Sequence, residues 1–180
     1  REATVTKAEP SSGALEIPST LYGLPVTGIG DYAFAQCGGL TSVTIPSGVT
    51  SVGKGVFWYC SGLTSVSMTS GVTNVGEKAF FWCTQLTSIT IPDSVIEIGG
   101  SAFAGCAKLV RIDVAEGNRA YSAVDGVLYD KQQNVLVAFP CGKTEVEIPL
   151  TVRSIGMGAF CACSSLTNIT LPDSVKSLEG

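Results

Sequence analysis

The chain of 180 residues is 45% hydrophobic and only 14% charged, with a formal net charge of −4. This length suits one folded domain with a sizeable core, and the mean hydropathy of +0.36 excludes a disordered segment. No apolar run approaches the ~18 residues of a membrane span and no cluster of Lys or Arg could hold a phosphate backbone, so we expect no membrane span and no nucleic-acid partner.

The first 25 residues lack the pattern that fills the remainder of the chain. Segments 3–7 and 14–18 have the composition of two short strands, and the turn-forming run Pro10-Ser11-Ser12-Gly13 lies between them. A stack of repeats leaves an open edge at its first unit. We therefore predict that residues 1–25 form an N-terminal β cap.

From residue 26 onwards the chain repeats itself every 23 residues. Residues 26–48 and 49–71 share 12 of 23 identities. The common pattern is V-x-x-I-G-x-x-A-F-x-x-C-x-x-L-x-x-V-x-I-P-x-[SG]. Units begin at Val26, Val49, Val72 and Val95, an interrupted unit covers about 118–151, and further units begin at Val152 and, truncated, at Val175.

The repeated positions predict the shape of one unit. Val43 and Ile45 are two residues apart and point to one face of a short strand, which Pro46 ends. The three-residue spacing of Ala33-Phe34-x-x-Cys37-x-x-Leu40 favours a short helical or 3₁₀ turn. One unit cannot enclose its own apolar side, so stacking is required. Residues 26–180 are therefore predicted to form a repeat solenoid, mainly β, whose core includes Phe34, Phe57, Phe80, Phe103 and Phe160.

Five of the seven cysteines share one repeat position: Cys37, Cys60, Cys83, Cys106 and Cys163. We predict that they form a column of buried, reduced thiols that behave as small apolar groups. Disulfides or a zinc site are the alternative, which the absence of C-x-x-C and of histidine disfavours. Cys141 and Cys161 lie outside this column, and the alternation around Cys161 allows an exposed thiol.

The outward positions of the predicted strands change character along the chain. They are Ser42/Thr44, Ser65/Ser67, Ser88/Thr90, Arg111/Asp113, Glu145/Glu147 and Asn168/Thr170. The charges break the regular array of hydroxyl groups, which disfavours ice binding. Parallel stacking would place Arg111 beside Glu145 and Asp113 beside Glu147. Solvated charge is the favoured interpretation of this patch (Arg111, Asp113, Glu145 and Glu147), with a weak calcium site or a partner contact as alternatives.

A second variable surface is aromatic. The two residues between Phe and Cys are Trp58/Tyr59 in one unit and Phe81/Trp82 in the next, where other units carry mainly small residues. Stacking at ~4.8 Å would bring these four side chains into one surface. Large aromatic residues contribute much of the binding energy of interfaces, so we predict a binding site here. The alternative is that one ring of each pair packs against the coil or its neighbour.

The combination of Ile-Gly, Ala-Phe, Cys, Leu and Ile-Pro resembles the BspA-like leucine-rich repeat family of bacterial surface proteins. Segments 125–130 and 135–140 resemble the hairpin coil of that family, which replaces the Ala-Phe-x-x-Cys arc. The resemblance implies a right-handed leucine-rich repeat coil in a secreted or surface-anchored module, whose relatives adhere to host proteins or to other cells. It implies no site residue, because the family pattern is structural.

Catalysis finds little support in the sequence. There is no histidine, no Ser-x-x-Lys and no Gly-x-Ser-x-Gly, and Gly28-x-Gly30 lacks the third glycine of a phosphate loop. We therefore predict neither an enzyme nor a bound cofactor or metal.

The predicted function is a cell-surface or secreted binding module that recognises a protein or a glycan. A structural spacer within a larger surface protein is the alternative. We expect a monomer, with weak self-association through an open C-terminal edge. Because the chain begins with Arg and carries no signal peptide, we expect it to be a piece of a longer protein.

Overall fold

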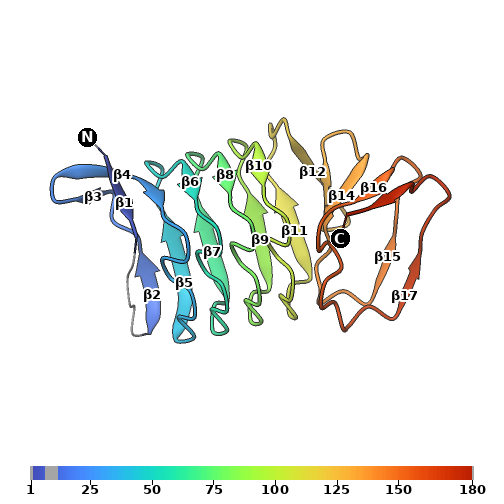
Figure 1. Ribbon diagram of the computed structural model, residues 1–180, viewed down its shortest axis with the longest axis horizontal. Helices are drawn as coiled ribbons and strands as arrows, with labels where there is room; N and C mark the ends of the chain where they lie inside the picture. The colour runs from blue at the N-terminus through green and yellow to red at the C-terminus, as the bar shows by residue number, and fades with distance from the viewer. Residues whose placement is uncertain (1, 7–11, 180) are drawn as a thin grey trace.

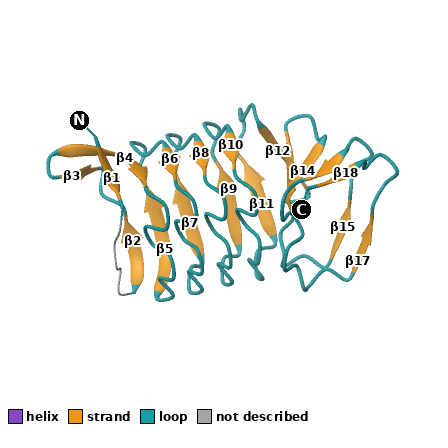
Figure 2. Ribbon diagram, viewed as in Figure 1, coloured by secondary structure: helices purple, strands orange, loops and turns teal. Residues whose placement is uncertain are grey.

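The computed structural model describes residues 2–6 and 12–179 and shows an elongated stack of β-coils (Figure 1). The described residues consist of strands, turns and loops without a helix (Figure 2), so none of them forms a helix able to cross a membrane. The predicted solenoid is confirmed. Half of the predicted turn at 10–13, Pro10 and Ser11, and the end of segment 3–7 lie outside the described residues.

One side of each coil is a strand with the Leu-x-x-Val-x-Ile pattern, and together these strands form face A. Neighbours pair in parallel at the repeat spacing, as Ser42 opposite Ser65 and Arg111 opposite Ser88 show. Hydrophobic and polar residues alternate along them, so Val43 and Ile45 are buried while Thr44 is exposed. The strands of face A are β2 (Gly13–Glu16), β5 (Leu40–Ile45), β7 (Ser65–Met68), β9 (Ser88–Ile91), β11 (Arg111–Val114), β15 (Glu145–Glu147) and β17 (Asn168–Thr170).

A second row of mostly two-residue strands forms face B. It comprises β1 (Ala3–Val5), β4 (Leu24–Ile29), β6 (Ser51–Val52), β8 (Asn74–Val75), β10 (Glu97–Ile98), β12 (Tyr121–Val124), β13 (Val127–Asp130), β14 (Val135–Ala138), β16 (Ser154–Ile155) and β18 (Ser177–Leu178). The short strand β3 (Thr20–Leu21) pairs antiparallel with β4. At the N-terminal end β1 pairs with β4 and β2 pairs with β5, so the segment before Val26 continues both faces.

The arc between a face B strand and the next face A strand differs from the prediction, because it is a series of turns and not a helical or 3₁₀ turn. Each regular arc contains two residues with left-handed backbone angles four positions apart, such as Tyr32 (φ 56°) and Gln36 (φ 62°). A left-handed residue interrupts the helical hydrogen-bond pattern. Alternate arc amides instead donate to the next coil, as Phe34 N–H does to the Val56 carbonyl at 3.0 Å, and those between them donate within the arc, as Ala35 N–H does to the Tyr32 carbonyl at 3.1 Å.

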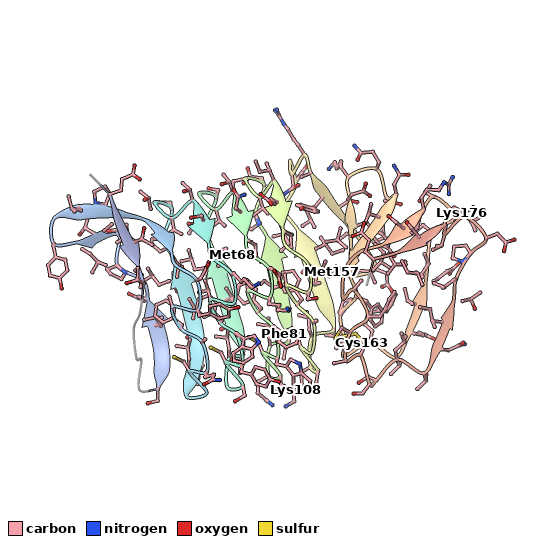
Figure 3. All side chains as sticks on the ribbon, viewed as in Figure 1. Met68, Phe81, Lys108, Met157, Cys163 and Lys176 are labelled. Carbon is pink, nitrogen blue, oxygen red and sulfur yellow. A yellow bond between two sulfur atoms is a disulfide. The ribbon has the colours of Figure 1, made fainter. Side chains whose placement is uncertain are left out.

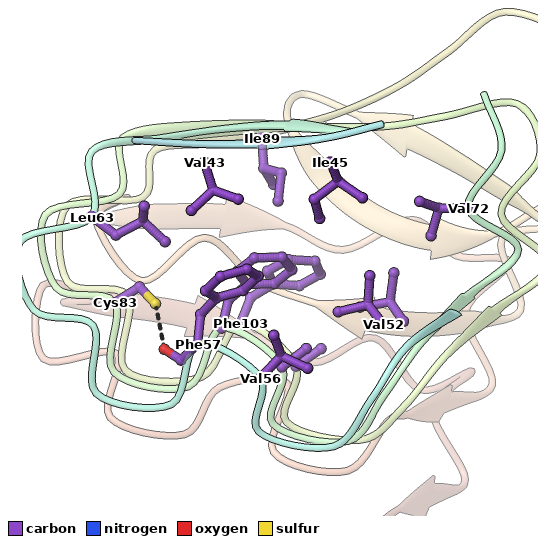
Figure 4. Close-up of a cluster of buried hydrophobic side chains, with 14 of the residues drawn as sticks. Val43, Ile45, Val52, Val56, Phe57, Leu63, Val72, Cys83, Ile89 and Phe103 are labelled. Carbon is purple, nitrogen blue, oxygen red and sulfur yellow. Dashed lines mark hydrogen bonds between the residues drawn. The ribbon is translucent and has the colours of Figure 1, made fainter. Parts of the chain in front are cut away.

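The core is a ladder of repeated side chains with phenylalanine at its centre (Figure 4). The rings of Phe34, Phe57, Phe80 and Phe103 stack with centroid separations of 5.5, 5.4 and 5.6 Å and interplanar angles of 13° or less. All four rings are buried. Phe160 is only half-buried and contacts Phe139 at 5.1 Å, in a smaller second cluster under the last coils.

The interrupted coil carries a three-stranded antiparallel meander, β12-β13-β14, on face B. Its first turn has Asp125 and Gly126 in left-handed conformations (φ 48° and 74°), as a two-residue hairpin requires. The meander displaces most of the arc, so Ser101 and Gly105 donate across it to the carbonyls of Met157 and Cys161. Phe139 retains a place between the two arcs, where its N–H donates to the Ala159 carbonyl at 3.0 Å.

Candidate binding surfaces

The structure brings Trp58, Tyr59, Phe81 and Trp82 together and adds Tyr32, which the sequence reasoning missed. The ring centroids of Tyr32 and Trp58 are 6.5 Å apart and those of Trp58 and Tyr59 are 4.5 Å apart, and both contacts are edge-on. Tyr59 stacks on Trp82 at 5.6 Å with an interplanar angle of 2°. The ring centroid of Phe81 lies 6.1 Å from that of Tyr59. These five residues form a continuous aromatic cluster over three successive arcs.

Three members of the aromatic cluster have backbone angles that side chains of their size rarely adopt. Tyr32, Tyr59 and Trp82 have φ values of 56°, 57° and 59°. The equivalent positions of other arcs have left-handed angles too, but they carry glycine or smaller or polar residues: Gly55, Gly105, Gly158, Gln36, Lys78, Ser101 and Ala162. A bulky residue at such an angle costs about 1–3 kcal/mol, and such residues gather at functional sites. The cluster is thus maintained against a local conformational cost.

The rings lie against the glycines of the next coil. A Cβ on Gly105 would lie 2.9 Å from Cγ and Nε1 of Trp82, and one on Gly55 would lie still closer to the Tyr32 ring. The Trp82 ring is therefore enclosed between Tyr59 on one side and Gly105 on the other. An aromatic residue followed by glycine one repeat later is the sequence signal that could have identified Tyr32.

Tyr32 and Tyr59 are 47% and 40% exposed, whereas Trp58, Phe81 and Trp82 are half-buried. The alternative predicted from the sequence is that one ring of each pair packs against the coil or its neighbour. The half-buried rings are partly covered in this way, and part of each side chain remains exposed. The most exposed rings of the cluster are those of Tyr32 and Tyr59.

Charged side chains lie in the same arcs as the aromatic cluster. Glu77 accepts hydrogen bonds from Lys54 and Lys78, each at 2.9 Å, in a three-residue ion-pair network. The hydrogen bond from Lys54 lowers the pKa of Glu77, and the same contact raises the pKa of Lys54. The three side chains provide polar groups in the arcs that carry the aromatic cluster.

The predicted charged patch is not one surface. Arg111 Nε donates to Asp113 on its own strand at 2.6 Å, and the hairpin turn at Asp125–Gly126 lies against Arg111. Strand β15 pairs only with β17 among the described strands, so Glu145 and Glu147 are not the strand neighbours of Arg111 and Asp113. The predicted pairings are wrong because the hairpin inserts between the two strands.

Most of the predicted cysteine column exists, but its last member does not fit the prediction. Cys60, Cys83 and Cys106 are buried, and each thiol donates to the phenylalanine carbonyl of the preceding coil, of Phe34, Phe57 and Phe80, at 3.0–3.1 Å. Cys37 is half-buried. Cys163 is not a reduced thiol, because it forms a disulfide with Cys141.

The disulfide follows from the shortened arc of the interrupted coil. Phe139-Pro140-Cys141 has one residue between Phe and Cys instead of two, which brings Cys141 into the column with its Cα 4.2 Å from that of Cys163. The prediction that Cys141 lies outside the column is therefore wrong. Cys161 is exposed, as its alternation allowed. In the described part of the chain no three His, Cys, Asp or Glu residues converge as metal ligands would.

Burial of the column thiols makes the protein less stable as the pH rises into the alkaline range. Desolvation raises the pKa of Cys60 from 9.0 to about 12 and that of Cys106 to about 12. Because the folded state holds these protons more tightly than the unfolded state, their contribution is fully present below pH ~9 and is lost as pH rises towards ~12. We expect the free energy of unfolding, measured in urea, to fall by up to ~1.4 kcal/mol per pH unit for each thiol.

The variant Cys60→Ala should reduce this alkaline slope by one proton relative to the wild type. Burial also raises the pKa of Tyr129 to about 12, and this contribution is the same in the variant and in the wild type. An unchanged slope in Cys60→Ala would show that the thiol is not the titrating group.

Stacked parallel coils with a Leu-x-x-Val-x-Ile strand and a phenylalanine core define the class of leucine-rich repeat solenoids. The model of the BspA type leucine rich repeat region matches residues 14–123 and 138–180, with six copies. The chain therefore belongs to the BspA type leucine rich repeat family. A search of curated proteins gives no match.

Three solved bacterial structures illustrate the similarity. The pneumococcal vaccine antigen PcpA has a TM-score of 0.74 and 23% identity, with 86% of this chain and 45% of the antigen covered. A leucine-rich repeat protein from Eubacterium ventriosum has a TM-score of 0.67 and 25% identity, with 93% of this chain and 55% of that protein covered. A leucine rich cell surface protein from Faecalibacterium prausnitzii has a TM-score of 0.63 and 26% identity, with 98% of this chain and 68% of that protein covered. The chain spans about half the length of the first two.

Proposed function

We propose that this chain is a non-enzymatic binding module at a bacterial cell surface and that the aromatic cluster contacts its partner. The observation that carries the proposal is the set of bulky aromatic residues at left-handed positions, Tyr32, Tyr59 and Trp82, where the other arcs carry glycine or non-aromatic residues. The other arcs close without large rings at these positions, so closing an arc does not require the aromatic side chains. A rigid coil presents such rings with little loss of entropy on binding.

The ring geometry favours a protein partner over a glycan. A sugar stacks on the face of an aromatic ring, and the faces of Trp82 are covered by Tyr59 and Gly105. The exposed Tyr32 and Tyr59, in arcs that carry or adjoin the Lys54–Glu77–Lys78 network, instead suit an apolar side chain surrounded by polar contacts.

Two further observations support a surface location. Disulfides such as Cys141–Cys163 persist in oxidising surroundings outside the cytosol. One of the similar structures is that of a protein described as a cell surface protein. The elongated stack in Figure 1 also suits a spacer that holds another domain away from the cell, which is the second candidate function.

Replacing Tyr59 and Trp82 together by glycine should remove partner binding and leave the fold intact. Glycine adopts φ values near 57° and 59° without cost, as Gly105 does in the next arc, so only the rings are lost. The measurement is affinity for purified host-matrix proteins and for bacterial surface proteins, by surface plasmon resonance. We expect a loss of at least about 100-fold, as hot-spot residues give.

The matched control is Tyr22→Gly, which removes a fully exposed aromatic residue with φ 53° outside the cluster. It should leave the affinity unchanged. Equal affinity of the control and the double variant would reject the aromatic cluster as the contact site. If the wild-type chain bound none of the host-matrix or bacterial surface proteins, the result would favour the spacer.

A further inference from the structure

We propose that the free edge of strand β15 binds an extended, cationic segment of a partner protein, which adds to face A as an extra strand. This surface is separate from the aromatic cluster. It follows from the interruption of face A, where the ladder of parallel strands breaks between β11 and β15 (Figure 1).

The hairpin covers one side of the break. Ile112 N–H on β11 donates to the Gly126 carbonyl at 2.9 Å, so the hairpin turn takes the place of a strand beside β11. Lys143 holds the turn by donating from Nζ to the carbonyl and to Oδ2 of Asp125, at 2.8 and 2.6 Å. The edge of β11 is therefore occupied.

The other side of the break has no described partner strand beyond Gly142, whose N–H donates to the Leu109 carbonyl at 2.7 Å. Strand β15 pairs with β17 and with no other described strand. Backbone groups of successive residues point alternately to the two sides of a strand, so half of those of β15 point into the break. An unpaired row of N–H and C=O groups is a template for one more strand.

The side chains around the break select what could occupy it. A groove between the hairpin and β15 is lined by apolar Val124, Val127 and Val146, together with Asp125 and Glu147. A second groove continues along β15 past Glu145 to Asn168 and Thr170. An incoming strand with alternating apolar and polar residues would meet valine with one set and carboxylates with the other.

The charges indicate a cationic strand. Arg111 pairs with Asp113 and Lys143 pairs with Asp125, so these four charges compensate one another. Glu145 and Glu147 are exposed and, among the described residues, form no ion pair. The two uncompensated carboxylates on β15 complement Lys or Arg at alternate positions of a partner strand.

The probe is a fluorescent peptide of sequence Lys-Val-Lys-Val-Lys-Val with blocked ends, whose binding is measured by anisotropy. We expect Glu145→Gln/Glu147→Gln to weaken binding by about fivefold or more, as two exposed charge pairs would. A peptide with N-methylated alternate amides should bind about tenfold more weakly, because it cannot complete the ladder. Tyr59→Gly/Trp82→Gly should bind the peptide normally, which separates this proposal from the aromatic cluster.

The charge-matched control is Glu16→Gln/Glu97→Gln, which removes two exposed carboxylates elsewhere on the solenoid. Equal weakening in this control would show non-specific charge attraction and overturn the proposal. Unchanged affinity of the N-methylated peptide would overturn strand addition. No binding at about 1 mM peptide would show that the glutamates only protect the edge from pairing.

Discussion

Replacing Phe80 by alanine should lower the free energy of unfolding by about 3–5 kcal/mol. Phe80 is fully buried and stacks on both neighbours, on Phe57 at 5.4 Å and on Phe103 at 5.6 Å. The cavity would lie between two coils held by the backbone ladder, so it cannot close by collapse. Urea unfolding followed by far-UV circular dichroism measures the change.

The matched control is Phe160→Ala, at the same repeat position. Phe160 is half-buried at the margin of the second cluster, and its ring is tilted by 33° to that of Phe139. We expect a loss of about 1–2 kcal/mol, since less apolar surface is removed from water in the native state. Equal losses in the two variants would mean that the central stack contributes no more than ordinary burial.

The regular coils could be predicted from the sequence because the same residue recurs in the same environment. Once Val43 and Ile45 are placed on one side of a strand, the 23-residue period places their equivalents, and the phenylalanine and cysteine columns follow. The turn conformation of the arcs could not be predicted, because the spacing Phe34-x-x-Cys37 is the same in a helical turn and in a turn with left-handed residues.

The interrupted coil was the part that periodicity could not describe. Its arc is one residue shorter between Phe139 and Cys141, and this shift moves Cys141 into contact with Cys163. The hairpin also separates Arg111 from Glu145, so pairings extrapolated across it failed. Both errors come from counting an irregular coil as if it had the regular path.

The candidate aromatic site was predictable in position but not in geometry. Repeat register placed Tyr59 beside Trp82, and the two rings do stack. The role of Gly105, whose missing side chain leaves room for the Trp82 ring, depends on a backbone angle that the sequence does not specify.

Replacing Asn118 by alanine should lower the free energy of unfolding by about 3–5 kcal/mol, although this asparagine occupies a position where regular coils have valine. Asn118 is 1% exposed. Its amide donates to the carbonyls of Pro92 and Val95 at 2.7 and 3.0 Å, and its oxygen accepts from the N–H groups of Ala120 and Tyr121 at 2.9 and 2.7 Å. One side chain thus bonds four backbone groups where the chain leaves the regular coil. The Pro92 carbonyl also accepts from Val95 N–H at 3.3 Å, so the substitution removes the side-chain partner of the other three, and each buried group left unpaired costs about 1–3 kcal/mol.

Asn118→Val separates hydrogen bonding from packing, because valine fills this position in the preceding coils at Val26, Val49, Val72 and Val95. We expect Asn118→Val to lose nearly as much stability as Asn118→Ala, since neither can pair the four backbone groups. The exposed Asn134 of the same coil serves as the control, and Asn134→Ala should change stability by no more than about 0.5 kcal/mol. Wild-type stability of Asn118→Val in urea unfolding would show that the regular valine packing suffices and that the meander is held by its own strands.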